Sequence, residues 1–442
     1  MMEPEEKSTV YFTIIPSNAG FTDQLLQFST YYKLGLSLGY VYVHSNFTNR
    51  RHGAESIFDF LGFNDQFAGN RLTSREKLYG WMGVSNNFGG ESKSWHRKIR
   101  DKLKYWPLHK LFFRKFNFID IGLGDTVPVE EDAEPAAGLC ALIRNVVGCN
   151  RTPDSGRKNV VRFYLTGGKF FFEKLAPALN RQLPYFPDGL DLRASYFQQE
   201  AFGSRPSQYL DGKTRLLVHI RLGDTALIET PWRSFVPLWA YWCISPLKEY
   251  ADKSDRLFRK LMDVEDFALF LRKFYTLLDA DDLSTVVFSD GYKAAFRDLF
   301  QKLGDLRLSN EKIRALKESA GTYEARRFSV FDEFQNCVCR VGETNEDLQQ
   351  LVHAALNAEV VIVGCHQRMI PKLLATYYDS KLESPPIIIS LHKGIEPRYG
   401  LEIGLTPEKA RVYSVNVTDL ESDQGLIDAV NEIKRRQTKR GP

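Results

Sequence analysis

The sequence predicts an α/β protein of two Rossmann-like lobes, each built around a buried sheet. Near the N-terminus a strand, a glycine-bearing loop, a helix and a second strand follow one another, which is the order of a βαβ unit. Strands and helices alternate again from Arg215 onward, after a stretch rich in Gly, Pro, Ser and Asp at 203–213. We therefore predict an N-terminal lobe over 8–205, a C-terminal lobe over 206–405, and a C-terminal helix with a basic tail over 406–442.

The N-terminal lobe opens with a run of β-branched and aromatic residues, Val10 to Ile15, which is typical of a buried strand. Apolar residues then recur at helical spacing over 22–38, and Thr22 or Asp23 is the expected N-cap. Residues 40–43 predict the next strand. Further along, we expect a basic and aromatic segment at 86–118, forming either an exposed helical face or one wall of a groove, an acidic loop at 122–138, and a strand and helix within 157–191.

The C-terminal lobe begins with an apolar strand, 216–220, followed by a short polar turn. The pattern then changes repeatedly between runs of strand length and amphipathic runs of helix length. It predicts further strands at 285–288, 360–363 and 387–390, and helices at 264–278, 292–303, 345–357, 369–378 and 420–433.

The composition narrows the class of protein. Apolar residues make up 43% and charged residues 26%, which is typical of a soluble globular chain. The 59 basic and 55 acidic side chains leave a net charge of +4, too small an excess to predict a nucleic-acid surface. The N-terminus is acidic, without a secretory signal, and no apolar run is long enough to span a membrane. A cytoplasmic location is therefore expected.

The six cysteines lack the spacing of a zinc site, and reduced thiols are favoured over a metal held by Cys337, Cys339, Cys365 and His366.

The strongest chemical signal is His219-Ile-Arg221-Leu-Gly223-Asp224, at the end of the first strand of the C-terminal lobe. His219 and Arg221 are two residues apart on a strand, so both side chains point to the same side. Arginine is planar, permanently charged and able to bind two phosphate oxygens at once. A structural alternative is equally compatible with the spacing: Arg221 and Asp224 could pair to close the turn around a buried His219.

Residues 219–224 resemble the His-x-Arg-x-Gly-Asp turn shared by the α1,2-, α1,6- and protein O-fucosyltransferase superfamily. Weaker similarities occur in the same order along the chain. They are Gly20-Phe-Thr-Asp-Gln24-Leu25, Phe58-Asp-Phe-Leu-Gly-Phe63, Phe288-Ser289-Asp290 and the segment from Asp347 to Gln367.

The resemblance implies a GT-B-like fold with an interlobe cleft, acceptor on the N-terminal lobe and nucleotide sugar on the C-terminal lobe. It implies an inverting glycosyltransferase that uses GDP-fucose as donor and has no obligatory metal or other cofactor. The acceptor would be a glycan or a lipid-linked glycan, the latter bringing peripheral contact with a membrane. Arg221 would be catalytic, and Phe21 and Gln24 would contact the acceptor. Asp23 is a candidate for the general base because it lies on the N-terminal loop expected to face the cleft, and a helix N-cap is its alternative role. The donor would be bound by His219, Gly223, Asp224, Gly20, Ser289, Asp290, Gly364, Cys365, His366 and Arg368.

The chain also departs from the family pattern. Thr22 and Asp23 stand where the family has a second glycine and an asparagine, and the 364–368 loop lacks the serines or threonines that contact donor phosphates. The sugar and nucleotide therefore stay open. Two alternatives remain: a transferase that uses another nucleotide sugar, and a catalytically silent protein of the same fold that binds nucleotide sugars or glycans. The sole Asp-x-Asp, Asp279-Ala-Asp281, precedes a strand, and we interpret it as a solvated turn rather than a metal site.

Overall fold

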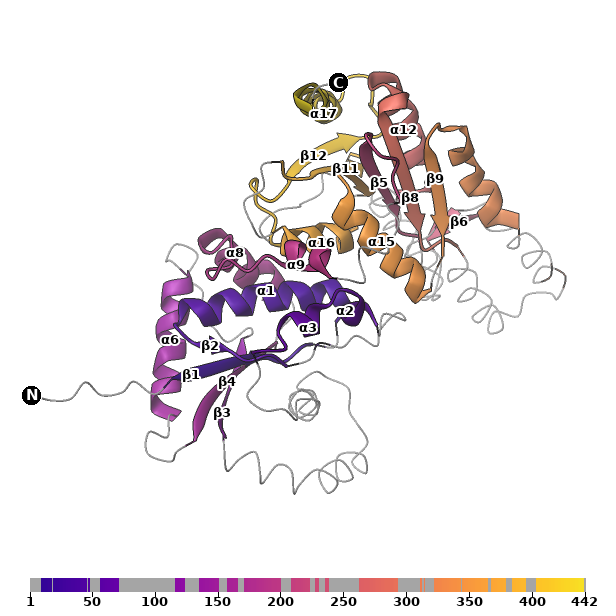
Figure 1. Ribbon diagram of the computed structural model, residues 1–442. Helices are drawn as coiled ribbons and strands as arrows, with labels where there is room; N and C mark the ends of the chain where they lie inside the picture. The colour runs from indigo at the N-terminus through magenta and orange to yellow at the C-terminus, as the bar shows by residue number, and fades with distance from the viewer. Residues whose placement is uncertain are drawn as a thin grey trace, which may run out of the picture. The chain divides into compact units, whose positions relative to one another are not determined.

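The chain divides into two compact units (Figure 1). The first comprises Met1–Gly203, Ala375–Lys381 and Gly400–Thr406, and the second comprises Ser204–Leu374, Leu382–Tyr399 and Pro407–Pro442. The computed structural model describes residues 9–17, 19–45, 47, 56–70, 116–123, 135–150, 157–165, 171–199, 208–222, 227–229, 235–237, 262–292, 311, 314, 322–342, 344–364, 367–378, 384–394 and 403–440.

The first unit contains a four-stranded sheet in the order β2-β1-β4-β3, with every pairing parallel. Its strands are β1 (Val10–Ile14), β2 (Val41–Tyr42), β3 (Phe116–Leu123) and β4 (Lys158–Leu165). Its helices are α1 (Phe21–Ser37), α2 (Ile57–Phe60), α3 (Phe63–Gln66), α6 (Pro135–Asn150), α8 (Ala176–Gln182) and α9 (Leu192–Gln198), with a π-helical turn at Phe171–Leu175.

Aromatic side chains hold α1 against this sheet. The Tyr32 ring of α1 lies 4.9 Å from Tyr42 of β2 and 6.2 Å from Phe12 of β1 between ring centroids. The Phe28 ring of α1 lies 5.9 Å from Tyr42. Gly35 lies so close to the Phe12 ring that a Cβ there would overlap it. This close approach explains a glycine within the last turn of α1, although glycine generally lowers the stability of a helix.

The second unit contains a six-stranded parallel sheet in the order β12-β11-β10-β5-β8-β9. Its strands are β5 (Thr214–Ile220), β8 (Leu283–Ser289), β9 (Cys337–Val341), β10 (Val360–Gly364), β11 (Ile387–His392) and β12 (Arg411–Asn416). When the strands are numbered by their order in the chain and the sheet is followed from β9 to β12, the order is 3-2-1-4-5-6, as in the Rossmann fold. A separate antiparallel pair is formed by β6 (Leu227–Glu229) and β7 (Phe235–Pro237).

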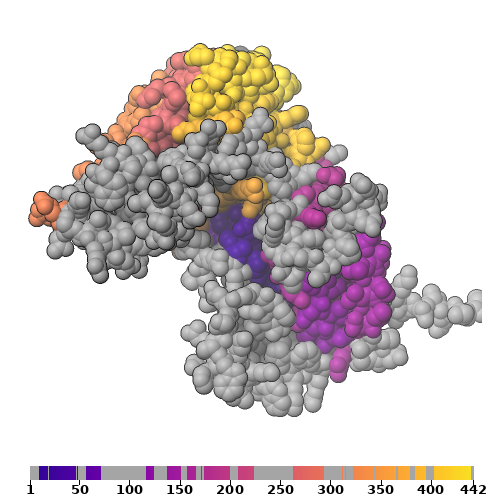
Figure 2. All heavy atoms as spheres, turned by 180° about the vertical axis from the view of Figure 1, so that it is seen from behind, coloured from indigo at the N-terminus to yellow at the C-terminus, as the bar shows by residue number. Residues whose placement is uncertain are grey.

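Helices cover both faces of this sheet (Figure 1). Leu216, Val218 and Ile220 of β5 belong to the core cluster that includes α12 (Val264–Leu277) and α17 (Gln424–Arg440). α15 (Asn345–Asn357) and α16 (Met369–Tyr377) lie on the other face. From behind, β12 and α17 form one continuous part of the surface, coloured yellow in Figure 2. Short 3-10 turns precede β8 at Ala280–Asp282 and β9 at Ser329–Glu333.

The α/β class with two parallel sheets is therefore confirmed. α15 has the predicted bounds, while α17 begins four residues later than expected and continues to Arg440. The predicted acidic loop at 122–138 is partly wrong, because β3 continues to Leu123 and α6 starts at Pro135. Most of the basic and aromatic segment at 86–118, and nearly all of the helix predicted at 292–303, lie outside the described residues.

Candidate functional site

The loops after β5 and β10 leave the sheet at its topological switch point. β5 and β10 are neighbours, with His219 beside Val363, but the chain continues from β5 to β8 on one side and from β10 to β11 on the other. Right-handed crossovers in opposite directions place the helices that follow on opposite faces of the sheet, and open α/β sheets generally bind their ligands at such a point. The Arg221 turn and the 364–368 loop, predicted separately from the sequence, therefore end neighbouring strands at the same edge.

His219 is a buried, neutral imidazole at this edge. It is 4% exposed and alternates with the core residues Val218 and Ile220, so its side chain lies on the α15 face of the sheet. Burial, and to a lesser extent the nearby charge of Arg221, lowers the pKa of His219 to about 3. Its Nδ1 has no hydrogen-bond partner in the part of the chain that the structure describes.

Arg221 follows directly on β5 and is exposed, whereas its neighbour Leu222 is 1% exposed. The Leu222 amide donates a 2.7 Å hydrogen bond to Asp290 Oδ1, on the loop after the adjacent strand β8. The turn is thus anchored by its backbone and a buried side chain, and the guanidinium is left at the surface. The predicted partner Asp224 and the predicted Gly223 lie outside the described residues.

The loop after β8 makes a tight turn directly beyond the strand. Gly291 has φ +67°, and its amide donates to Ser289 Oγ at 3.0 Å. A Cβ at Gly291 would overlap the Glu324 carboxylate and lie 2.6 Å from Val341 Cγ1. Ser289 is buried, so its hydroxyl oxygen serves this turn, while the half-buried Asp290 holds the Leu222 amide.

The loop after β10 is packed closely at its start. A Cβ on Gly364 would lie 3.1 Å from Met262 Cγ and 3.2 Å from Gln367 Nε2. Arg368 is exposed at the beginning of α16, and its carbonyl accepts a hydrogen bond from the Lys372 amide at 3.0 Å. Cys365 and His366 lie outside the described residues.

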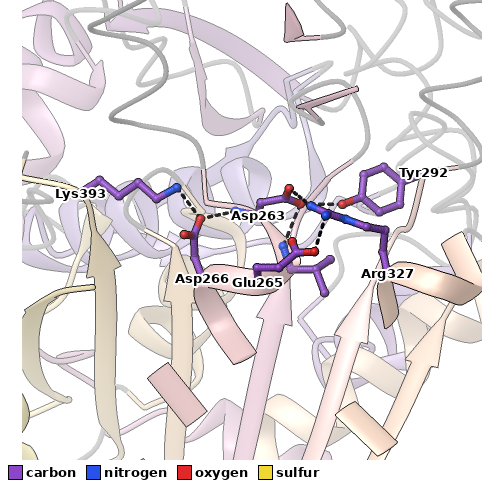
Figure 3. A network of polar contacts seen from close by, with 7 residues as sticks. Asp263, Glu265, Asp266, Tyr292, Arg327 and Lys393 are labelled. Carbon is purple, nitrogen blue, oxygen red and sulfur yellow. Dashed lines mark hydrogen bonds and ion pairs between the residues drawn. The ribbon is translucent and has the colours of Figure 1, made fainter. Parts of the chain in front are cut away.

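The N-terminus of α12 carries its own anions. In Rossmann folds the helix after the first strand presents its positive end to a bound phosphate. Here that end holds the carboxylates of Asp263, Glu265 and Asp266, with Asp263 as N-cap. Arg327 pairs with Asp263 and Glu265, and Lys393 pairs with Asp266 at 2.7 Å (Figure 3). The positive end of the α12 dipole is therefore balanced by carboxylates of the helix's own first turn.

The predicted site did not include these α12 residues. Asp263 before an apolar helical run is an N-cap signal that the sequence contains. Nothing in the sequence pairs it with Arg327, 64 positions away.

The first unit places the other predicted residues at the start of α1. The N-cap is Gly20 and not Thr22 or Asp23, and no side chain caps the helix there. Asp23 lies in the first turn, half-buried, with Oδ2 3.7 Å from where a Gly20 Cβ would be. Phe21 and Gln24 are buried, and Gln24 Nε2 donates to the Ala19 carbonyl at 3.2 Å. Buried side chains of α1 therefore support the residues before the helix, and Asp23 is more accessible than Phe21 or Gln24.

Asp279 and Asp281 lie at the amino end of β8, as predicted, where Asp279 accepts a 3.0 Å hydrogen bond from the Asp281 amide. They form a capped turn at the amino end of β8, whereas Arg221 follows the carboxyl end of the parallel strand β5. Within the described ranges, three or more His, Cys, Asp or Glu side chains nowhere gather in an arrangement suited to a metal ion. No helix in those ranges combines the length and apolar character needed to cross a membrane.

No protein-family model and no curated protein matches the chain. Solved structures that are similar to it include two glycosyltransferase structures. Escherichia coli ADP-heptose LPS heptosyltransferase II is 13% identical, with 98% of this chain and 100% of that chain covered and a TM-score of 0.36. An arginine-to-lysine variant of Arabidopsis thaliana FUT1 in complex with GDP is 9% identical, with 84% of this chain and 70% of that chain covered and a TM-score of 0.32. The function proposed below rests on the residues at the strand ends.

Proposed function

We propose that this chain is a glycosyltransferase that moves a sugar from a nucleoside diphosphate to a glycan hydroxyl. Fucose from GDP-fucose is the first donor to test, with inversion at the anomeric carbon and no obligatory metal. The observation that carries the proposal is the exposed Arg221, at the switch point of a 3-2-1-4-5-6 sheet and beside a neutral, buried His219. The sequence around both residues resembles the fucosyltransferase turn.

The proposed step is a single displacement. The acceptor hydroxyl oxygen bonds to the anomeric carbon while the bond from that carbon to the β-phosphate oxygen breaks. The hydroxyl proton passes to a base, and the nucleoside diphosphate leaves with the bonding electrons. Negative charge grows on the β-phosphate, so a guanidinium placed there stabilises the transition state more than the bound donor. Arg221 would supply that charge without a metal ion.

Asp23 is the proposed base, because its half-buried carboxylate lies in the first turn of α1 and the N-cap position is Gly20 instead. We expect Asp23→Asn to lower kcat at least about a hundredfold, the scale of general-base catalysis, with little change in donor affinity. Initial rates and GDP calorimetry on one preparation measure the two effects. Thr22→Ser, a substitution in the same turn, is the control. Turnover that survives Asp23→Asn would assign the base to another residue.

Arg221 provides the main test. Calorimetry with GDP, UDP and their sugars should show binding of one nucleoside diphosphate, and incubation with donor should release it. Arg221→Ala should abolish both donor hydrolysis and transfer. The free energy of unfolding should change by no more than about 0.5 kcal/mol, because the side chain is exposed. Arg221→Lys keeps the charge but loses two-point phosphate contact, so partial activity is expected.

The matched control for Arg221→Ala is Arg411→Ala, which removes another exposed arginine of the second unit, from strand β12. Binding of UDP but not GDP would favour a transferase for another nucleotide sugar. Binding without turnover on any glycan would favour the catalytically silent alternative. A large loss of stability in Arg221→Ala would show that the residue is structural.

A further inference from the structure

The strongest feature outside the proposed reaction is the polar network at the start of α12 (Figure 3). Asp263 lies at its centre and accepts hydrogen bonds from three different segments of the second unit. Its Oδ1 accepts from its own helix, at the Val264 amide (2.8 Å), and from the Tyr292 hydroxyl (2.6 Å). Its Oδ2 pairs with Arg327. A largely buried carboxylate with this many donors is fixed in position.

Tyr292 is in turn held at both ends. Its hydroxyl is bonded to Asp263, and its amide donates to Glu324 Oε2 at 2.8 Å. The ring is fully buried and packs edge-on against Tyr323, with 5.0 Å between centroids. Burial and the charge of Asp263 raise the pKa of Tyr292, so the hydroxyl stays protonated and donates across the ordinary pH range.

The fixed Tyr292 lies in the same loop as the residue that holds the Arg221 turn. Asp290 is two residues before Tyr292, and Gly291 between them has little freedom in its packed turn. Asp290 accepts the hydrogen bond from the Leu222 amide, next to Arg221. A continuous set of hydrogen bonds and one covalent segment therefore joins the N-cap of α12 to the arginine that we place at the diphosphate.

We propose that Tyr292 and Asp263 are positioning residues, which fix the loop after β8 and so hold the Arg221 turn in the conformation that binds the diphosphate. This inference rests on the proposed function for its consequence at the donor. Its structural part, the restraint of the Arg221 turn, stands separately. Holding the turn in advance spares the donor the entropy of ordering it, so donor affinity should depend on a hydroxyl that touches no substrate.

Tyr292→Phe in the full-length protein tests the inference, because it removes one hydroxyl and keeps the buried ring. Amide hydrogen exchange, followed by mass spectrometry, should become about tenfold faster in peptides spanning Leu222 and Gly291. Peptides from Ile387–His392 should be unchanged. The affinity for the nucleoside diphosphate that the wild type binds should fall roughly three- to tenfold, the effect of one lost hydrogen bond. Asp263→Asn, which keeps an acceptor for Tyr292, should retain more affinity than Asp263→Ala.

Glu265→Gln is the matched control. It removes a carboxylate that also pairs with Arg327 but lies outside the set of contacts leading to Asp290. Exchange at Leu222 and nucleotide affinity should both stay at wild-type values. Equal exchange at Leu222 in wild type and Tyr292→Phe overturns the inference, even if both proteins bind nucleotide. Faster exchange in a protein that binds no nucleoside diphosphate overturns the proposed function and leaves the restraint of the turn established.

Discussion

At the scale of single residues, His219 and Arg221 are two positions apart in the chain but lie in opposite environments. One side chain is buried and neutral, and the other is exposed and permanently charged. The spacing on a strand predicts that the two lie near each other, and the influence of Arg221 on the pKa of His219 agrees with this. The sequence could not tell whether His219 carries a charge, because that depends on burial by segments distant in the chain.

His219 should make the folded state sensitive to acid. Its pKa is lowered from 6.5 to about 3, so between these values the unfolded chain takes up a proton that the folded chain does not. The free energy of unfolding therefore falls as the pH drops below about 6.5. The stability that neutral His219 contributes is fully present only above that pH. From pH 6.5 to about 5 the residue should account for a loss of roughly 2 kcal/mol. Urea unfolding of wild type and His219→Gln at both pH values measures it. An equal fall in the two proteins would mean that His219 titrates normally when folded.

At the scale of secondary structure, agreement was best where strong local signals coincide. α15 begins after Thr344 with a capping box and has the predicted bounds. α1 begins before its expected N-cap, and the side chains of Gln27 and Gln24 in this helix bond the Ser17 amide and the Ala19 carbonyl ahead of it.

In the sheet of the second unit, the two edge strands, β9 and β12, were not predicted. β9 alternates between partly buried and exposed positions, and β12 is fully buried at a single residue, Val415. Both strands contain polar residues among their valines. Edge strands need only one neighbour, so their sequences carry a weaker apolar signal than central strands such as β10, which is buried throughout. Their place in the sheet is set by pairing with β8 and β11.

The capping box of α15 provides an element-scale prediction. Thr344 Oγ1 accepts from the Asp347 amide at 3.2 Å, and the Thr344 amide donates to Asp347 Oδ2 at 2.9 Å. Thr344→Ala should lower the free energy of unfolding by about 1 kcal/mol, as measured by urea titration. Thr344→Ser, which keeps the hydroxyl, should stay close to wild type. The same loss in both variants would trace the effect to the methyl group instead.

At the scale of the whole molecule, the first unit is completed by segments from far along the chain. Tyr377, which is 1% exposed, packs edge-on against Tyr196, and the Tyr378 ring lies 4.9 Å from the Arg193 guanidinium carbon. Gly404 lies close to Asn180, with 3.4 Å from an added Cβ to Nδ2. A division of the chain at Gly203 would therefore remove part of the first unit's own core.

A fragment of residues 1–203 should accordingly be less stable than the same unit in the full chain. Loss of a buried aromatic contact such as that of Tyr377 typically costs about 3–5 kcal/mol. We expect an unfolding transition at lower urea concentration, followed by circular dichroism, and stronger binding of a hydrophobic dye than in the full chain. Adding the 204–442 fragment should restore part of the lost stability. An isolated fragment with the unfolding midpoint of the full chain would show that those segments are dispensable.

The sequence by itself determined the α/β class, most of the central strands and helices, and the residue types at the end of β5. These features follow from local periodicity and from chemistry between close neighbours in the chain. Only the tertiary structure decided the order of the strands, which makes the end of β5 a switch point, and the contacts that join Asp263, Tyr292 and Asp290 to the Arg221 turn. Both depend on pairings between residues tens of positions apart, and local sequence preferences carry no information about such pairings.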